Sequence, residues 1–110
     1  MQRGSADRPV RLVLTPAAAA DLDEAFAYVS SERVEAAEGL LSRFRHALEQ
    51  LRQFPMLGVA FVAIEDEPLR PGARFIVVEP YLVFYRVLED AIVILRILHA
   101  RRDSLGELLG

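Results

Sequence analysis

The feature that most constrains the fold lies in the last third of the chain, where two apolar runs flank a short polar break. Residues 81–87 and 91–98 are rich in β-branched and aromatic side chains, and Glu89-Asp90 separates them. This pattern predicts a strand, a turn and a second strand. A hairpin of this composition must bury one face against other elements, and its second face is then available to a partner.

The register of this hairpin follows from the length of its turn, provided that no bulge intervenes. The expected cross-strand neighbours are Val87 with Ile92, Tyr85 with Ile94, Val83 with Arg96 and Tyr81 with Leu98. Alternation then gives an apolar core face made of Leu82, Phe84, Val93, Leu95 and Ile97. The mixed face carries Tyr81, Val83, Tyr85, Ile94, Arg96 and Leu98. It is either an ordinary exposed sheet face or a docking surface, because interfaces are enriched in Tyr and Arg.

The upstream part of the chain supplies a strand and two helices. Residues 10–14 alternate as a short strand does, and Thr15-Pro16 offers an N-cap followed by a first helical residue. The first helix has a narrow apolar stripe of Ala18, Leu22, Ala25, Phe26 and Val29. The stripe of the second helix comprises Val34, Ala37, Leu41, Phe44, Leu48 and Leu51. Ser30-Ser31 interrupts the helical pattern and can cap the second helix, which ends at Phe54-Pro55.

Residues 55–72 have no sustained period and predict a loop with a brief extended piece at 61–64, whereas residues 74–79 predict a strand. The expected fold class is therefore α+β: an N-terminal strand, an α-helical hairpin and a C-terminal three-stranded antiparallel meander, in the order β-α-α-β-β-β. We expect residues 1–9 to form a polar, flexible leader and residues 10–110 to form a single domain. No run approaches the roughly 18 apolar residues of a membrane span, so the expected location is the cytoplasm.

Composition argues against several functions. A net charge of −3 argues against a generic nucleic-acid binder. All 13 cationic side chains are arginine, so no lysine can act as a base or a Schiff-base amine. There is no cysteine, and the two histidines, His46 and His99, belong to no metal-ligand pattern. We therefore expect no metal and no other cofactor.

Several short motifs, taken in order, resemble the RelE/ParE superfamily of bacterial toxins, and in detail its ParE branch. They are Phe54-Pro55 followed by Gly58, Leu-Arg-Pro-Gly-Ala-Arg at 69–74, Phe-Tyr-Arg-Val at 84–87, and the run from Ile94 to Asp103. With residues 12–21 at the start of the first helix, the resemblance covers about residues 10–103. The sequence departs from the family pattern at Val59, where a basic residue is common, and at Ala100, where glycine is common.

This resemblance implies the toxin of a type II toxin–antitoxin module, which inhibits DNA gyrase by binding and performs no catalytic chemistry of its own. It also implies neutralisation by a cognate ParD-like antitoxin that folds as it binds, in a hetero-oligomer, without membrane contact or direct sequence-specific binding to nucleic acid. We expect the target to contact Tyr81, Tyr85, Arg96, His99, Arg101, Arg102 and Asp103. The antitoxin is expected to contact Leu22, Phe26, Val29, Leu41 and Arg74.

The alternative is a ribosome-dependent mRNA endoribonuclease, as in the RelE branch. Its candidate catalytic residues are His99, Arg74, Arg96, Arg101 and Tyr85, with Glu67 or Glu79 as a distant base. Strand alternation places His99 on the helix side of the sheet, away from Arg96 and Tyr85, which favours binding over catalysis. A third alternative is a degenerate, inactive toxin that is retained as an antitoxin partner.

Overall fold

The computed structural model describes residues 10–60 and 72–101. In chain order, the elements are β1 (Arg11–Leu14), α2 (Pro16–Ser30), α3 (Val34–Gln53), the 3-10 turn η1 (Pro55–Leu57), β2 (Val59–Ala60), β3 (Arg74–Val78), β4 (Tyr81–Val87) and β5 (Ala91–His99). The predicted α+β class and the strand, helical hairpin and meander are confirmed. The short strand β2 was not predicted. The predicted leader and the extended piece at 61–64 lie outside the described residues.

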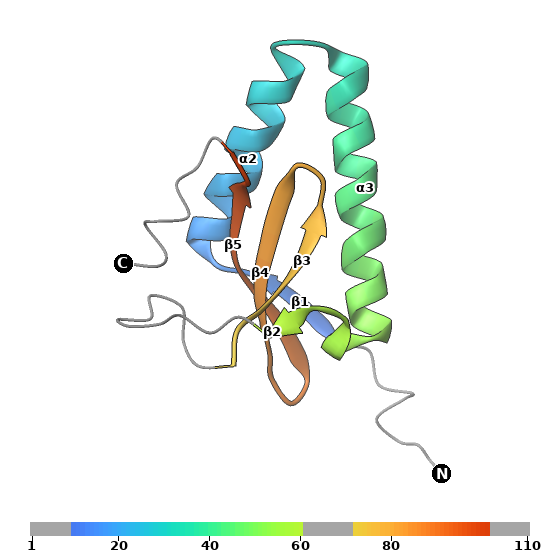
Figure 1. Ribbon diagram of the computed structural model, residues 1–110, viewed down its shortest axis with the longest axis vertical. Coiled ribbons are helices and arrows are strands. Elements are labelled where there is room, and N and C mark those ends of the chain that lie inside the picture. The colour runs from blue at the N-terminus through green and yellow to red at the C-terminus, as the bar shows by residue number, and fades with distance from the viewer. Residues whose placement is uncertain (1–9, 61–71, 102–110) are drawn as a thin grey trace.

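The strands form one mixed sheet with the order β1-β5-β4-β3-β2 (Figure 1). β3, β4 and β5 make the predicted antiparallel meander, and β2 adds to its outer edge. β1 pairs in parallel with β5, from Arg11 opposite Ala91 to Leu14 opposite Ile94. The first strand and the last described strand are therefore neighbours, and β5 lies between β1 and β4.

α2 begins at the cap that the sequence predicts. The side chain of Thr15 accepts a 3.0 Å hydrogen bond from the N–H of Ala18, and its hydroxyl donates to the carbonyl of Leu95 at 2.9 Å. Pro16 takes the first helical position. This cap therefore both starts α2 and attaches it to β5.

The predicted cap of the second helix is wrong. The hydroxyls of Ser30 and Ser31 donate back to the carbonyls of Ala27 and Tyr28, in the last turn of α2. Arg33 precedes α3 and makes no side-chain cap hydrogen bond. Glu32 and Arg33 separate the two serines from α3, so the serines cannot cap it. They instead donate to carbonyl groups at the end of α2, which have no partner within the helix.

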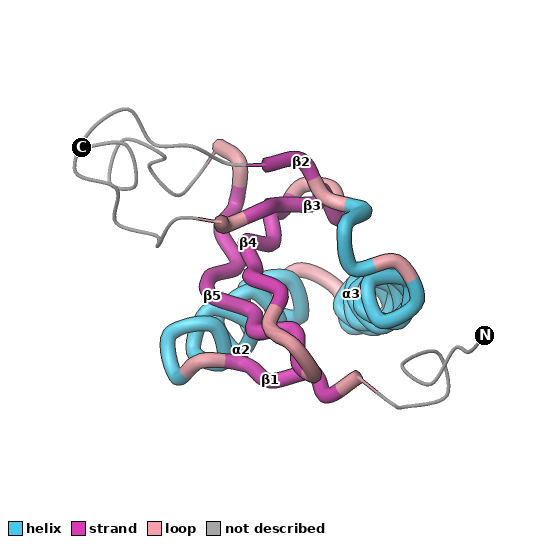
Figure 2. Tube along the Cα trace, turned by 90° about the horizontal axis from the view of Figure 1, so that it is seen from below, coloured by secondary structure: helices cyan, strands magenta, loops and turns pink. Residues whose placement is uncertain are grey.

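The two helices form an antiparallel hairpin against the sheet, with α2 alongside β5 and β1 and α3 alongside β3 (Figure 2). The buried positions of α2 are alanines, Ala18 and Ala25, whereas α3 buries Ala37, Leu40, Phe44 and Leu51. Leu40 was not in the predicted stripe. Phe26 and Val34 were, but they are 39% and 61% exposed. None of the described helices combines the length and hydrophobicity of a membrane span.

The predicted hairpin register is confirmed only near the turn. Val87 lies opposite Ile92 and Tyr85 opposite Ile94, but a bulge follows between Tyr85 and Phe84. Leu95 is the extra residue of this bulge. Beyond it, the pairs are Phe84 with Arg96, Val83 with Ile97, Leu82 with Leu98 and Tyr81 with His99. The predicted pairs of Val83 with Arg96 and of Tyr81 with Leu98 are therefore wrong.

The predicted assignment of the hairpin faces is also wrong. Tyr81 and Tyr85 are 2% and 0% exposed and belong to the main core, together with Val83, Ile92, Ile94 and Ile97. Three of the predicted core residues, Leu82, Phe84 and Leu95, join a second, smaller cluster with Ala73, Phe75 and Leu98. Both faces of the hairpin are apolar, so alternation alone could not decide which face the helices cover.

Candidate binding site

Tyr85 connects β4 to the junction between α3 and β2. Its hydroxyl donates a 2.8 Å hydrogen bond to the carbonyl of Pro55 and accepts one of 2.8 Å from the N–H of Gly58. Arg74 of β3 donates to the carbonyl of Gly58 at 2.7 Å. Burial raises the pKa of Tyr85, and the Gly58 N–H and the charge of Arg74 oppose that rise. Three of the motifs noted in the sequence therefore meet in one hydrogen-bonded cluster.

Arg96, expected to contact the target, instead pairs with α2. Its Nε donates to one carboxylate oxygen of Asp21 at 2.7 Å, and its Nη2 donates to the other oxygen at 3.1 Å. The same carboxylate accepts the backbone N–H of Ile97 at 2.9 Å. β1 ends opposite Ile94, so Asp21 satisfies a backbone group of β5 that β1 does not reach.

His99 lies at the end of β5 on the helix side of the sheet, as predicted, but Tyr85 faces the same side, so the predicted separation of these two side chains is wrong. Its ring meets that of Tyr81 edge-on, with 5.2 Å between centroids, and its Nδ1 accepts a 3.1 Å hydrogen bond from the N–H of Arg101. Arg101 is exposed. Arg102 and Asp103, the other residues expected to contact the target, lie outside the described residues.

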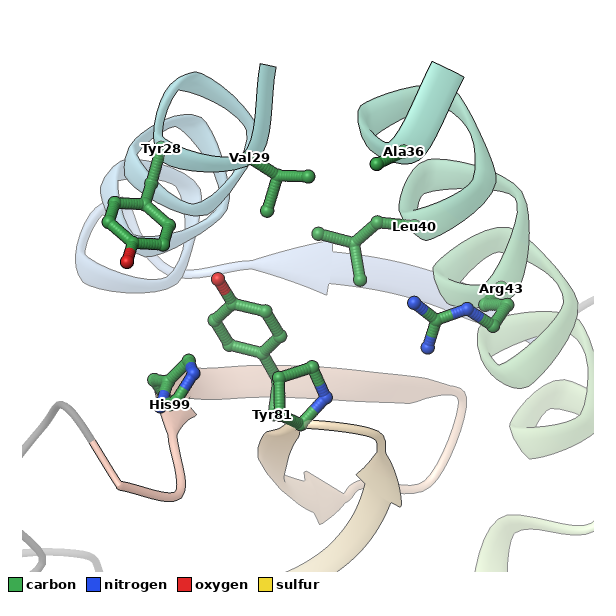
Figure 3. Close-up of a pocket in the computed structure, with 8 residues that line it drawn as sticks. Tyr28, Val29, Ala36, Leu40, Arg43, Tyr81 and His99 are labelled. Atoms are coloured by element: carbon green, nitrogen blue, oxygen red, sulfur yellow. The ribbon is translucent and has the colours of Figure 1, made fainter. Parts of the chain in front are cut away.

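Two hollows open along the helical hairpin. The first, here called the hairpin pocket, has a volume of about 200 Å³ and lies between α2, α3 and the start of β4 (Figure 3). It is lined by Tyr28, Val29, Ala36, Leu40, Arg43, Pro80, Tyr81 and His99.

The second hollow, here called the α3–β3 groove, has a volume of about 550 Å³. It is lined by Ser42, Arg43, His46, Ala47 and Gln50 of α3 and by Val77, Val78 and Glu79. β2 pairs only with Arg74 and Phe75, so no described strand pairs with the outer edge of β3 beside this groove.

The structure does not bring the expected antitoxin contacts into one patch. Val29 lines the hairpin pocket, Phe26 is exposed on α2, and Leu22 packs against the core. Leu41 is half-buried, and Arg74 is bound to Gly58. Among the residues that line the hollows, sequence reasoning named Val29, Tyr81 and His99 as contacts but did not name Arg43 or His46. The one signal available in the sequence was that Arg43 and His46 lie three residues apart, beside the apolar stripe of the second helix.

The fold and these hollows define a small α+β domain with recesses between a helical hairpin and a sheet, the class to which RelE/ParE toxins belong. Residues 12–104 match the family described as the ParE toxin of the type II toxin-antitoxin system, parDE. The chain is 34% identical over 99 residues to Toxin ParE3 of Caulobacter vibrioides, covering 89% of this chain and 94% of that relative.

A solved structure described as a chromosomal ParDE TA system from P. aeruginosa is also similar. It has a TM-score of 0.63 and 28% identity, and the match covers 84% of this chain and 97% of the other. The chain belongs to the ParE toxin family of type II toxin–antitoxin systems, as its motifs predicted.

Proposed function

We propose that this toxin inhibits DNA gyrase by binding it, without catalytic chemistry of its own, and that a ParD-like antitoxin neutralises it. One observation carries the choice of binding over cleavage. Three of the side chains that a ribonuclease of this fold would use, Tyr85, Arg74 and Arg96, are engaged in structural contacts.

Cleavage of RNA requires a general base near the 2′-hydroxyl and donors near the phosphate. The phenol of Tyr85 is fully buried and already both donates and accepts a hydrogen bond. Arg74 is bound to Gly58, and Arg96 to Asp21. These contacts support a role in holding the fold, and leave target recognition to other residues.

For the target, we propose a contact surface at the end of β5. Arg101 is exposed beside His99, and Arg102 and Asp103 follow it in the sequence. A short, charged segment of this kind can recognise a partner without a shaped pocket. We leave Tyr81 and Tyr85 out of this surface because both side chains are buried.

For the antitoxin, we propose that an extended segment binds in the α3–β3 groove. The outer edge of β3 beside this groove offers backbone groups to an added strand, and Val77 is 56% exposed there. Arg43 and His46 supply polar contacts from α3. A segment that is disordered when free and folds on binding can use both the edge and the groove.

The test is to induce the toxin in bacteria and to measure the DNA-damage response and mRNA integrity separately. The proposal expects a strong damage response before any loss of transcripts, and its reversal by the antitoxin. Rapid cutting of translated mRNA without DNA damage would instead identify the ribonuclease. A chain without either effect would be an inactive toxin.

A further inference from the structure

The hairpin pocket is an apolar recess between the two helices. Its walls include Val29 of α2 and Leu40 of α3, which point toward one another above the ring of Tyr81 (Figure 3). Tyr28 also lines the pocket and is 49% exposed, so the recess opens to the surface. Because burial of apolar surface is favourable, such a recess favours an apolar side chain.

The volume of this pocket, about 200 Å³, suits an aliphatic side chain or two. An apolar cavity of roughly 150 Å³ is large enough to hold a molecule of benzene. Most small-molecule sites are larger, at roughly 300–1,000 Å³. The dimensions therefore favour a side chain that is supplied by a polypeptide segment.

The end of the described chain is attached to the pocket. The N–H of Ala100 donates a 2.9 Å hydrogen bond to the carbonyl of Pro80, and the N–H of Arg101 donates to Nδ1 of His99 at 3.1 Å. Pro80 and His99 both line the pocket. The backbone therefore leaves β5 at the edge of the pocket, and the next residues of the chain start there.

The other two stretches outside the described residues start elsewhere on the sheet. The N–H of Arg11 bonds to the carbonyl of Asp90, so residues 1–9 lead into the opposite end of β5. Residues 61–71 run between β2 and the start of β3, whereas the pocket lies beside the start of β4. Residues 102–110 are therefore the stretch whose starting point favours it as the occupant.

The sequence that follows β5 also has the composition to fill an apolar recess. Residues 102–110 contain three leucines, Leu105, Leu108 and Leu109. Their three- and four-residue spacing puts such side chains on one side of a helical turn. A stretch of four residues spans up to about 14 Å, so the first of these leucines can reach a pocket that is lined by His99.

We propose that residues 102–110 fold back onto the helical hairpin and bury leucine side chains, Leu105 first, in the hairpin pocket. Docking makes residues 102–104 a short connection beside the exposed Arg101, on the surface proposed above for the target. A partner that uses the pocket must displace these leucines, so the segment is an internal competitor for this site. The inference holds whether or not the target is gyrase.

The test uses the full-length chain with one introduced cysteine, because the sequence contains none. Ala36→Cys places a thiol in the hairpin pocket, and Ala47→Cys places the matched control in the α3–β3 groove. Both alanines are half-buried on α3. Each variant is made with the natural segment and with Leu105→Ser, Leu108→Ser, Leu109→Ser, and the rate of reaction with a soluble thiol reagent is measured.

Ala36→Cys should react about tenfold more slowly with the natural segment than with the serine variant, since such a difference means that the pocket is covered in about nine molecules of ten. The rate for Ala47→Cys should change by less than about twofold. Equal rates for Ala36→Cys in the two backgrounds would overturn the proposal. Protection that grows with protein concentration would also overturn it, because a second copy would then be the occupant.

A second measurement needs no variant, so it decides the matter even if the serine variant unfolds. In nuclear Overhauser spectra of the unaltered chain, the methyl groups of Leu105 should show contacts with those of Val29 and Leu40. A folded chain in which none of the three leucines contacts the pocket would contradict the proposal, while leaving the proposed function intact.

Discussion

The hydroxyl of Tyr85 accepts a 2.8 Å hydrogen bond from the backbone N–H of Gly58, and so ties the middle of the sheet to the end of the helical hairpin. The contact requires glycine. A Cβ at residue 58 would lie 2.6 Å from the Phe75 carbonyl oxygen and 2.6 Å from the Tyr85 hydroxyl. The glycine is therefore explained by close approach of the backbone, with no need for an unusual dihedral angle.

Gly58→Ala should lower the free energy of unfolding by about 2–3 kcal/mol, because either β3 or β4 must move to admit the methyl group. Denaturant unfolding measures this change. Gly39→Ala is the matched control. Apart from its chain neighbours and the nearby backbone of α3, no described atom lies within 4 Å of its Cβ position, so this variant should gain about 0.5–1 kcal/mol. An unchanged free energy of unfolding in Gly58→Ala would show that the contact between Gly58 and Tyr85 is loose.

Tyr85→Phe should cost about 1–3 kcal/mol, since the Pro55 carbonyl and the Gly58 N–H both lose their partner. The loss should appear in denaturant unfolding at neutral pH. A stability equal to that of the wild type would show that water replaces the phenol at no cost.

The same residue predicts a dependence of stability on alkaline pH. The pKa of Tyr85 is raised from 10.0 in the folded chain, so the folded state holds this proton more tightly than the unfolded state. Its contribution is therefore complete below pH 10.0 and is lost as the pH rises through the folded pKa. As the pH rises above 10.0, the free energy of unfolding should fall less steeply for Tyr85→Phe than for the wild type. Parallel curves would contradict this assignment.

Asp21→Ala should destabilise the chain by about 1–3 kcal/mol, because the carboxylate serves both Arg96 and the N–H of Ile97. Asp21→Asn can keep the contact with Ile97 and should cost less. The exposed neighbour Asp23 is the control, and Asp23→Ala should change stability by less than about 0.5 kcal/mol. Equal effects at the two positions would show that Asp21 acts only through net charge.

The double variant Arg101→Ala, Arg102→Ala should raise survival after toxin induction by about tenfold or more, if the end of β5 contacts the target. Antitoxin affinity should stay within about twofold, because Arg101 lines neither of the two hollows. The double variant Arg33→Ala, Arg45→Ala removes the same charge from two exposed positions, one just before α3 and one within it, and should leave toxicity unchanged. A large loss of thermal stability in the first variant would place the tail in the core instead.

Much of the fold could be predicted from local signals. The Thr15-Pro16 cap, the end of α3 at Phe54 and the strands of the meander follow from capping chemistry, proline and alternation. The side of the sheet to which His99 points was also predicted correctly. The bulge at Leu95 helped here, since it shifts the alternation of the outer half of β5 by one residue.

The candidate site could not be predicted in the same way, because its determinants are distant in sequence. Both faces of the hairpin are apolar, and Tyr85 is buried because it finds Pro55 and Gly58, which no local pattern reveals. Arg96 is likewise held by Asp21, on an element far from it in the chain. Tyr85 and Arg96, which have the character of interface residues, therefore make contacts within the fold, and the hollows lie beside α3.

The most direct test of gyrase binding uses purified components. DNA gyrase, ATP and plasmid are incubated with increasing wild-type toxin, and the products are treated with detergent and protease before electrophoresis. We predict linear plasmid that accumulates with toxin and disappears when one equivalent of antitoxin is added first. Unchanged supercoiling with no linear DNA, together with mRNA cutting in a parallel ribosome assay, would contradict the proposed function.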